Sequence, residues 1–447
     1  MNDKVEDKVQ DKVQEKVATD RTEPPSGEVS EVVEHLFRRE AGKMVATLTG
    51  IFGIEHLTLA EDVVQEALAR ALQTWPFYGV PKNPAAWIMR ASRNLALDVV
   101  RREKVFRNKE AEIVHLIEGQ NPAPDASVLA EQEITDDRLR LMFACCHPAI
   151  PAEAQVALAL KTLCGFNAAE ISRAFLTTEA AIAKRLTRAK QRIREARIPF
   201  EIPAGVELAK RLDGVLQSLY LLFNEGYKAS SGDSLVREDL CDEAIRLTSL
   251  LTEHPASDQP KTHALLALML LNAARIPARL DGEGNLLLLK EQDRARWDQA
   301  KIARGMFHFA RSAAGEEISE YHLQSGIAAC HCAAKNYAST DWHQILTMYD
   351  RLVEVDDSPV VALNRAIVIA NIDGPKAGLD AVAAIQGKEK LDSYYLLYAV
   401  LGELEAQLHD PLAAAGYFRK SLQLAEIKSE QTFLLKRFQA CEREISA

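Results

Sequence analysis

The chain has 447 residues, of which 47% are hydrophobic and 26% charged, and its formal net charge is −10. This length allows two to four domains with cores of their own, and the composition is ordinary for a soluble globular protein. The acidic balance excludes a protein coated in nucleic acid, but it leaves room for local basic patches. Abundant Ala and Leu with few aromatic residues favour helices, so the expected fold class is all-α.

The expected location is the cytoplasm, with no membrane partner. The N-terminus lacks the apolar core of a signal peptide. The longest apolar run, "ALLALMLLNAA" at 264–274, is too short to span a bilayer. Seven cysteines, an odd number without a C-x-x-C pair, indicate reduced thiols.

Residues 1–27 form a charged tail. Within it, "DKVEDKVQDKVQEKV" (3–17) repeats a four-residue unit whose valines are spaced i, i+4, and "TEPPSGE" follows. A transient helix fits this spacing, but the repeat has no second apolar stripe to bury. We therefore expect a disordered tail.

Residues 28–108 have a strong helical period. The stretch "TLAEDVVQEALARALQTW" begins with Thr58 three residues before Glu61, which is the signature of a capping box. A second helix is expected to begin at Pro84. Its predicted buried stripe is Ile88, Ala91, Leu95 and Val99. Seven basic and two acidic side chains between 85 and 109 make this helix an island of positive charge.

Residues 109–134 lose this regularity, and "EGQNPAPDAS" within them is typical of a linker. Residues 135–198 are predicted to be helical again, with breaks at "HPAIP" and "CGFN". The remaining residues, 199–447, are predicted to be helical almost throughout and form one C-terminal extension.

Two turn signals in the extension suggest repeated helical pairs. Gly374-Pro375 and Asp410-Pro411 lie 36 residues apart, each between two helix-length runs. The segment 391–425 resembles a tetratricopeptide unit. One stretch, "LDGEGNLLLLKEQDRARWD" at 280–298, interrupts the helical pattern.

The segment "TTEAAIAKRLTRAKQRIRE" at 177–195 is densely basic in an acidic chain. Its apolar residues line one helical face, and lysines and arginines lie on the other. A short amphipathic helix at 167–176 precedes it, and Thr177 or Thr178 can cap the second helix. Two short helices with a basic second member describe a helix-turn-helix that fits the major groove of DNA. A helical hairpin with a solvated basic face explains the periodicity equally well.

Three segments, in order, resemble bacterial RNA polymerase sigma factors of the extracytoplasmic-function type, which keep only regions 2 and 4. Residues 60–75 are similar to region 2.2, which grips the clamp of core polymerase. Residues 83–103 are similar to the part that melts and reads the minus-ten element. Residues 165–195 are similar to region 4, which reads the minus-thirty-five element. The chain departs from the family at Leu176, where most members have glycine.

The later segments "RLMFACCHPAIP", "LFNEGYKASSGD", "EQDRARWD" and "LNRAI" resemble the subgroup with a fused tetratricopeptide-like extension. In that subgroup the extension is thought to replace a membrane anti-sigma partner. The resemblance therefore implies a regulatory domain over the C-terminal half. Whether it activates or inhibits stays open, as does a soluble ligand or protein that acts on it.

The resemblance implies promoter-specific transcription initiation, with core RNA polymerase and promoter DNA as partners and no catalytic residue. Core polymerase binding is assigned to Asp62, Gln65 and Glu66. The minus-ten element is assigned to Trp87, Arg90, Asn94, Arg101 and Arg102. The minus-thirty-five element is assigned to Thr178, Lys184, Arg185, Arg188 and Lys190. Taken alone, the acidic face around Asp62 is better explained as the solvated side of an amphipathic helix.

The charged cluster in 280–298 is a candidate regulatory interface or ligand pocket, carried by Asp293, Arg294, Arg296 and Trp297. Its alternative is an exposed loop with i, i+4 ion pairs of small energetic value.

Cys145-Cys146-His147 and Cys330-His331-Cys332 invite a zinc interpretation. Adjacent cysteines rarely close one tetrahedral site, and no second metal-binding pair accompanies them. No phosphate-cradling or nucleophile-elbow motif occurs either. We therefore expect no metal, no cofactor and no enzyme activity.

Two other classes of function remain open. One is a helix-turn-helix regulator that binds a peptide or small molecule through its repeats and never joins polymerase. The other is a scaffold whose repeats do the work. The helix at 58–75 distinguishes a sigma factor from these classes, because a plain repressor needs no clamp-binding helix and a scaffold needs no promoter-reading residues.

Overall fold

The structure is a computed structural model that describes residues 26–102, 136–175, 177–203, 205–229 and 235–446. Nearly all of the expected tail and linker therefore lie outside the described residues. Within these ranges there is no β-strand, only an isolated antiparallel bridge between Leu280 and Leu286. The expectation of an all-α fold is confirmed.

The described residues fall into two compact units. Unit 1 contains 26–102, 136–167 and 184–201, and unit 2 contains 168–183 and the chain from 202 onward. One helix, α9 (Glu179–Ala196), begins in unit 2 and continues in unit 1.

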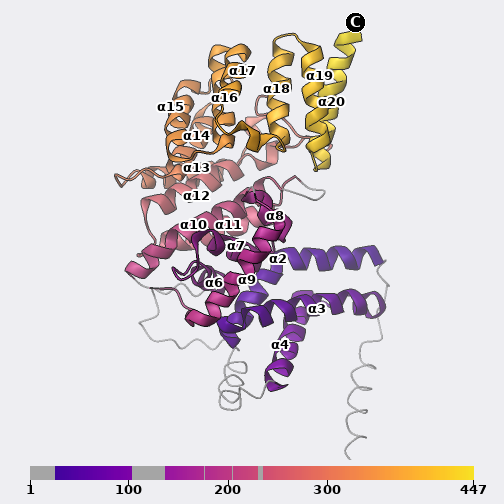
Figure 1. Ribbon diagram of the computed structural model, residues 1–447, viewed down its shortest axis with the longest axis vertical. Helices are drawn as coiled ribbons and strands as arrows, with labels where there is room; N and C mark the ends of the chain where they lie inside the picture. The colour runs from indigo at the N-terminus through magenta and orange to yellow at the C-terminus, as the bar shows by residue number, and fades with distance from the viewer. Residues whose placement is uncertain (1–25, 103–135, 176, 204, 230–234, 447) are drawn as a thin grey trace, which may run out of the picture. The chain divides into compact units, whose positions relative to one another are not determined.

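Unit 1 is built around its long first helix (Figure 1). Its elements, besides most of α9, are α2 (Ser26–Phe52), η1 (Ile54–His56), α3 (Leu57–Tyr78), α4 (Pro84–Arg102), α6 (Asp137–Cys145) and α7 (Ala152–Leu163). Helix α2 packs against α3 and α4 on one side of the sequence gap and against α6 and α7 on the other. The segments before and after the expected linker thus share one core in unit 1.

Gly42 allows α2 and α7 to approach closely. A Cβ atom at this position would lie 2.0 Å from the carbonyl oxygen of Leu163. No heavy atoms approach so closely without a bond, so any side chain here would push the two helices apart. Glycine is therefore required for this packing.

The buried stripe of α4 differs from the predicted one. The residues that are fully buried are Ile88, Ser92, Ala96 and Val100, whereas Ala91, Leu95 and Val99 are half-buried. Helix α4 is thus rotated about its axis relative to the expectation. Ser92 tolerates burial because its hydroxyl donates to the Ile88 carbonyl at 2.9 Å. The predicted start at Pro84 is confirmed.

The capping box expected at Thr58 and Glu61 does not form. Helix α3 begins at Leu57, and no side chain caps it. The Glu61 side chain is instead turned into unit 1, where it pairs with Lys190. The Glu61 carboxylate therefore binds Lys190, a residue distant in the sequence, and does not cap the backbone of α3.

Unit 2 is a succession of helices after the short α8 (Ala168–Ala174) and the first turn of α9 (Figure 1). Its first part comprises α10 (Val206–Tyr227), α11 (Glu238–Glu253), α12 (Pro260–Ala273), η2 (Ile276–Ala278), η3 (Arg294–Arg296), α13 (Gln299–Ser312), α14 (Glu320–Ala333) and α15 (Trp342–Val355). Its second part comprises α16 (Pro359–Asp373), α17 (Pro375–Ala383), η4 (Lys388–Leu391), α18 (Tyr395–Gln407), α19 (Pro411–Leu424) and α20 (Lys428–Ser446).

Neighbouring helices of unit 2 bury one another in short-range clusters. One apolar cluster joins α14, α15 and α16, a second joins α16, α17 and α18, and a third joins α19 and α20. Such nearest-neighbour packing is typical of stacked helical pairs. Gly374 and Asp410 precede α17 and α19, so both predicted turns are confirmed as helix boundaries.

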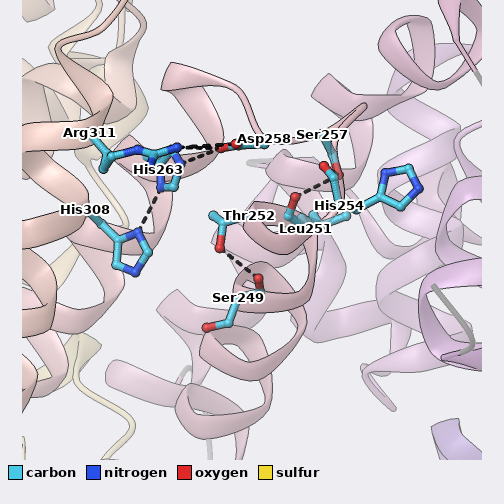
Figure 2. Close-up of polar contacts among 9 residues, drawn as sticks. All are labelled: Ser249, Leu251, Thr252, His254, Ser257, Asp258, His263, His308 and Arg311. Carbon is cyan, nitrogen blue, oxygen red and sulfur yellow. Dashed lines mark hydrogen bonds and ion pairs between the residues drawn. The ribbon is translucent and has the colours of Figure 1, made fainter. Parts of the chain in front are cut away.

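A chain of polar contacts connects α12 with α13 in unit 2. Figure 2 shows Arg311 and His263 both linked to Asp258, and His308 linked to His263. His263 Nε2 lies 2.7 Å from the Asp258 carboxylate, and His263 Nδ1 lies 2.8 Å from His308 Nδ1. Arg311 approaches the same carboxylate at 3.3 Å. Only one proton fits between the two facing imidazole nitrogens, so the two rings cannot be charged at the same time without breaking this contact.

Acid should weaken the α12–α13 contact through His308. Burial, and then the charges of His263, Arg304 and Arg311, lower the pKa of His308 to about 4. The unfolded chain, with a pKa near 6.5, then binds more protons than the folded one between pH 6.5 and 4. Stability contributed by neutral His308 is therefore lost as the pH falls through this window.

The measurement is the melting temperature between pH 7 and pH 4.5. His308→Gln removes the titration, so its curve should fall less steeply than the wild-type curve. The exposed His343→Gln on α15 should leave the slope unchanged. Parallel curves for the wild type and His308→Gln would show that the His263–His308 contact does not set acid sensitivity.

Candidate polymerase- and DNA-binding surfaces

Helix α3 presents the acidic row expected to bind polymerase. Asp62, Gln65 and Glu66 are exposed, while Val64 and Leu68 of the same helix are buried. Glu66 forms an exposed ion pair with Arg70 at 2.9 Å, of the weak i, i+4 kind. The burial pattern therefore leaves the three predicted side chains on one accessible face of α3.

Directly beside this row, Glu61 is buried with only 8% of its surface exposed. Burial raises the pKa of its carboxyl, while the ammonium groups of Lys190 and Lys161 oppose that shift. Lys190 comes from α9 and donates to the Glu61 carboxylate. A sequence-local search misses this pair because 129 positions separate its members.

Helix α4 carries the residues predicted for the minus-ten element. Trp87 is half-buried and meets the buried Trp75 of α3 edge to face, with ring centroids 5.5 Å apart. Arg90, Asn94 and Arg101 are exposed on the side of the helix opposite its buried stripe. Arg102 ends α4, and its side chain lies outside the described part. The contact with Trp75 holds one part of the Trp87 ring and leaves part of the indole accessible.

Helix α9 follows α8 closely in the sequence. The Thr178 hydroxyl accepts from the backbone N–H of Ala181 at 3.3 Å, so Thr178 caps α9. Burial of Ile182, Leu186, Ala189 and Ile193 confirms the predicted apolar face of α9. Lys184 and Arg188 are exposed on its basic face.

Two predicted DNA-binding residues have internal acidic partners. Arg185 Nη2 lies 2.7 Å from the carboxylate of Glu153 at the start of α7, and Lys190 holds Glu61. A groove of 620 Å³ runs along this part of unit 1. It is lined by Pro151, Glu153, Ala154, Arg185, Arg188, Ala189, Gln191, Arg192 and Glu195. The basic face of α9 is thus partly neutralised in this conformation.

The cluster around "EQDRARWD" is incorporated into the fold of unit 2. Asp293 accepts from Ala295 N at 2.9 Å and caps η3. Arg294 donates to the carbonyls of His331 and Ala334 at the end of α14, each at 2.6 Å. Arg296 is exposed, whereas Trp297 is only 2% exposed.

The cysteine and histidine clusters show no metal-binding geometry. Within the described residues, no three His, Cys, Asp or Glu side chains are grouped to hold a metal ion. Burial raises the pKa of Cys145 well above its usual range, and its sulfur lies 3.9 Å from the Thr162 hydroxyl. Cys332 is also partly buried, with its pKa raised to about 11 by burial. Such thiols are poor metal ligands and poor nucleophiles.

None of the described helices combines the length and the apolar composition that crossing a bilayer requires.

Two parts of the chain match known protein families. Residues 36–105, which cover most of α2 and all of α3 and α4, match sigma-70 region 2. This match supports a sigma-factor role in transcription initiation and implies binding to core RNA polymerase. Residues 211–313, from α10 to the end of α13, match a family of unknown function (DUF6596).

One relative that spans most of the chain shows the family. "Uncharacterized protein R00370" of Rhizobium meliloti (strain 1021) is 39% identical over 382 residues, which cover 85% of this chain and 89% of the relative. The chain belongs to the same family as that protein. No solved structure matches it.

The Glu61–Lys190 pair should support the packing of unit 1. The two side chains are 10% and 23% exposed, and removing one partner of a buried pair costs about 3 kcal/mol because the other charge stays uncompensated. We expect Lys190→Met to lower the free energy of unfolding by about this amount at pH 7.5. The pKa of the Glu61 carboxyl is raised from 4.5, so its charged form destabilises the fold as the pH rises. At pH 5 fewer molecules carry this charge, so the loss of stability in Lys190→Met should be smaller there than at pH 7.5.

Denaturant unfolding of the full chain at both pH values measures this effect. The double variant Glu61→Gln/Lys190→Met should recover most of the loss, and Lys184→Met, at an exposed site on the same helix, should cost little. Equal stability of Lys190→Met and the wild type at pH 7.5 would contradict a supporting role for the pair.

Proposed function

We propose that this protein is a sigma factor of the extracytoplasmic-function type that binds core RNA polymerase and directs promoter-specific initiation. The observation that carries the proposal is the match to sigma-70 region 2 over α2–α4, with Asp62, Gln65 and Glu66 exposed on α3. The proposal assigns polymerase binding to this row. It also places the protein beside polymerase in the cytoplasm.

In this proposal α8 and α9 act as a region 4 helix-turn-helix. The cap at Thr178 and the exposed Lys184 and Arg188 support it, because a capped basic helix can enter the major groove. Arg185 would exchange Glu153 for DNA, and Lys190 would contact DNA only after leaving Glu61. Arg101 and the indole of Trp87 would serve the minus-ten element, where unpaired bases stack on aromatic rings.

The extension, in this proposal, regulates the sigma part. Support comes from α8, which groups with unit 2, and from an ion pair between Arg173 of α8 and Glu426, between α19 and α20. This contact connects the first helix of the proposed helix-turn-helix to the last helical pair. The predicted interface at Asp293 and Arg296 remains a second candidate contact.

The test of polymerase binding uses the acidic row. Asp62→Arg/Glu66→Arg reverses two charges on an exposed face, so helicity should be unchanged while co-purification with core polymerase is lost. Asp98→Arg/Glu55→Arg, at exposed positions of α4 and η1, is the control of equal charge change. Full binding by the Asp62/Glu66 variant would remove polymerase contact from this face.

Run-off transcription then separates the proposal from its alternative. A sigma factor should support initiation by purified core polymerase on the DNA upstream of its own gene. A helix-turn-helix regulator that acts alone should bind this DNA without supporting initiation. Only the second result favours the alternative.

The Arg173–Glu426 pair tests regulation. Its side chains are 38% and 61% exposed, and an exposed pair is worth up to about 1 kcal/mol, which corresponds to about fivefold in an equilibrium. We expect Glu426→Arg to change promoter output by up to this factor, and Arg173→Glu/Glu426→Arg to restore it. Glu442→Arg on α20 should have no effect. Unchanged output from Glu426→Arg, or a failure of the swapped pair to restore output, would argue against this contact.

A further inference from the structure

Two arginine side chains lie beside the buried indole of Trp297. The guanidinium carbon of Arg294 lies 4.9 Å from the centre of the Trp297 ring, and that of Arg275, just after α12, lies 5.4 Å from it. Both cations are thus held beside one buried indole.

Neither guanidinium has a carboxylate within ion-pair distance in the described part of the chain. The three acceptors of Arg294 are neutral: two backbone carbonyls and the Thr340 hydroxyl at 3.2 Å. Burial and the charge of Arg275 lower the pKa of Arg294. Elsewhere in unit 2, partly buried cations do face carboxylates, as in Lys228–Glu430, Arg237–Glu225 and Arg437–Glu403.

Several buried nitrogen atoms close to these arginines lack a hydrogen-bond partner. Trp297 Nε1 and Arg275 Nε are buried without an acceptor among the described residues. His331 Nδ1 is also buried and without a partner. Burial and the two arginines lower the pKa of His331 to about 3, so its ring is neutral. Unpaired buried donors cost free energy that an acceptor would recover.

The two arginines differ in how firmly they are held. Arg294 is fixed by its bonds to the end of α14, where a cation also suits the helix dipole. The guanidinium of Arg275, in contrast, makes no hydrogen bond or ion pair in the described residues and is held by stacking. Arg275 can therefore turn toward a ligand, whereas Arg294 provides a fixed positive charge.

From this geometry we propose that Arg275, Arg294 and Trp297 form a binding site for a small oxyanion. Arginine binds phosphate and carboxylate groups through paired N–H donors, and the indole N–H would supply one more donor. The anion would balance the two cations and satisfy the buried donors. This proposal goes beyond the proposed function and does not depend on it, because it concerns binding to unit 2 alone.

The experiment measures the melting temperature of the full chain in sodium phosphate, in sodium acetate and in sodium chloride at equal ionic strength. We expect phosphate, acetate or both to raise it by about 2–4 °C over chloride, since a bound ligand stabilises the folded state. A rise with phosphate alone identifies a tetrahedral oxyanion, and a rise with acetate identifies a carboxylate.

Variants locate the site. Arg275→Gln should abolish the rise, and Arg275→Lys, which keeps the charge but not the paired donors, should reduce it. Arg304→Gln, an exposed position on α13 with the same charge change, should leave it intact. If Arg275→Gln does not fold, Arg275→Lys alone decides.

The proposal fails if neither anion stabilises the wild type beyond chloride. It also fails if the rise is the same in the Arg275 variants as in the wild type, since the anions would then act elsewhere on the surface.

Discussion

A buried carboxylate constrains unit 1 more than any other single group. Glu61 lies in the interior, where an ionised side chain is costly unless a cation accompanies it. The cation is Lys190, so α9 has to lie where the Lys190 ammonium group reaches Glu61 of α3. Gly42 adds a steric constraint nearby, because α7 can approach α2 only where no Cβ intervenes. Charge compensation and close approach together determine how the segments before and after the sequence gap share one core.

The same constraint affects the exposed surfaces of unit 1. Asp62 and Gln65 flank Glu61 on the accessible side of α3, and Lys190 shares α9 with Lys184 and Arg188. The proposed polymerase-binding row on α3 therefore lies next to Glu61, and the proposed DNA-binding row on α9 lies next to Lys190. The Glu61–Lys190 pair connects the two helices, while Asp62, Gln65, Lys184 and Arg188 remain accessible.

The helices could be predicted from the sequence because local signals determine them. Pro84, Gly374 and Asp410 each precede or begin a helix as expected, and Thr178 caps α9. The tertiary partners could not be predicted in this way. Glu61 pairs with Lys190, far along the chain, and does not form the expected capping box. Helix α4 buries Ser92, which the predicted stripe does not include.

The candidate sites divide along the same line. The exposure of Asp62, Arg90 and Arg188 follows from amphipathic periodicity, which the sequence shows directly. The pairing of Arg185 with Glu153, and the burial of Trp297 beside two arginines, depend on helices that meet only in the folded chain. No spacing in the sequence indicates them.

The Glu153–Arg185 pair has a consequence for the thermodynamics of the DNA binding that is proposed for α9. An arginine that neutralises a phosphate releases condensed cations from the duplex, and this release drives much of the binding. Arg185 leaves behind the carboxylate of Glu153, which is 70% exposed and attracts cations from solution in its place. The net number of cations released should therefore be smaller than the number of basic side chains that reach the backbone. Counting the arginines and lysines of α9 would then overestimate how steeply its DNA affinity falls with salt.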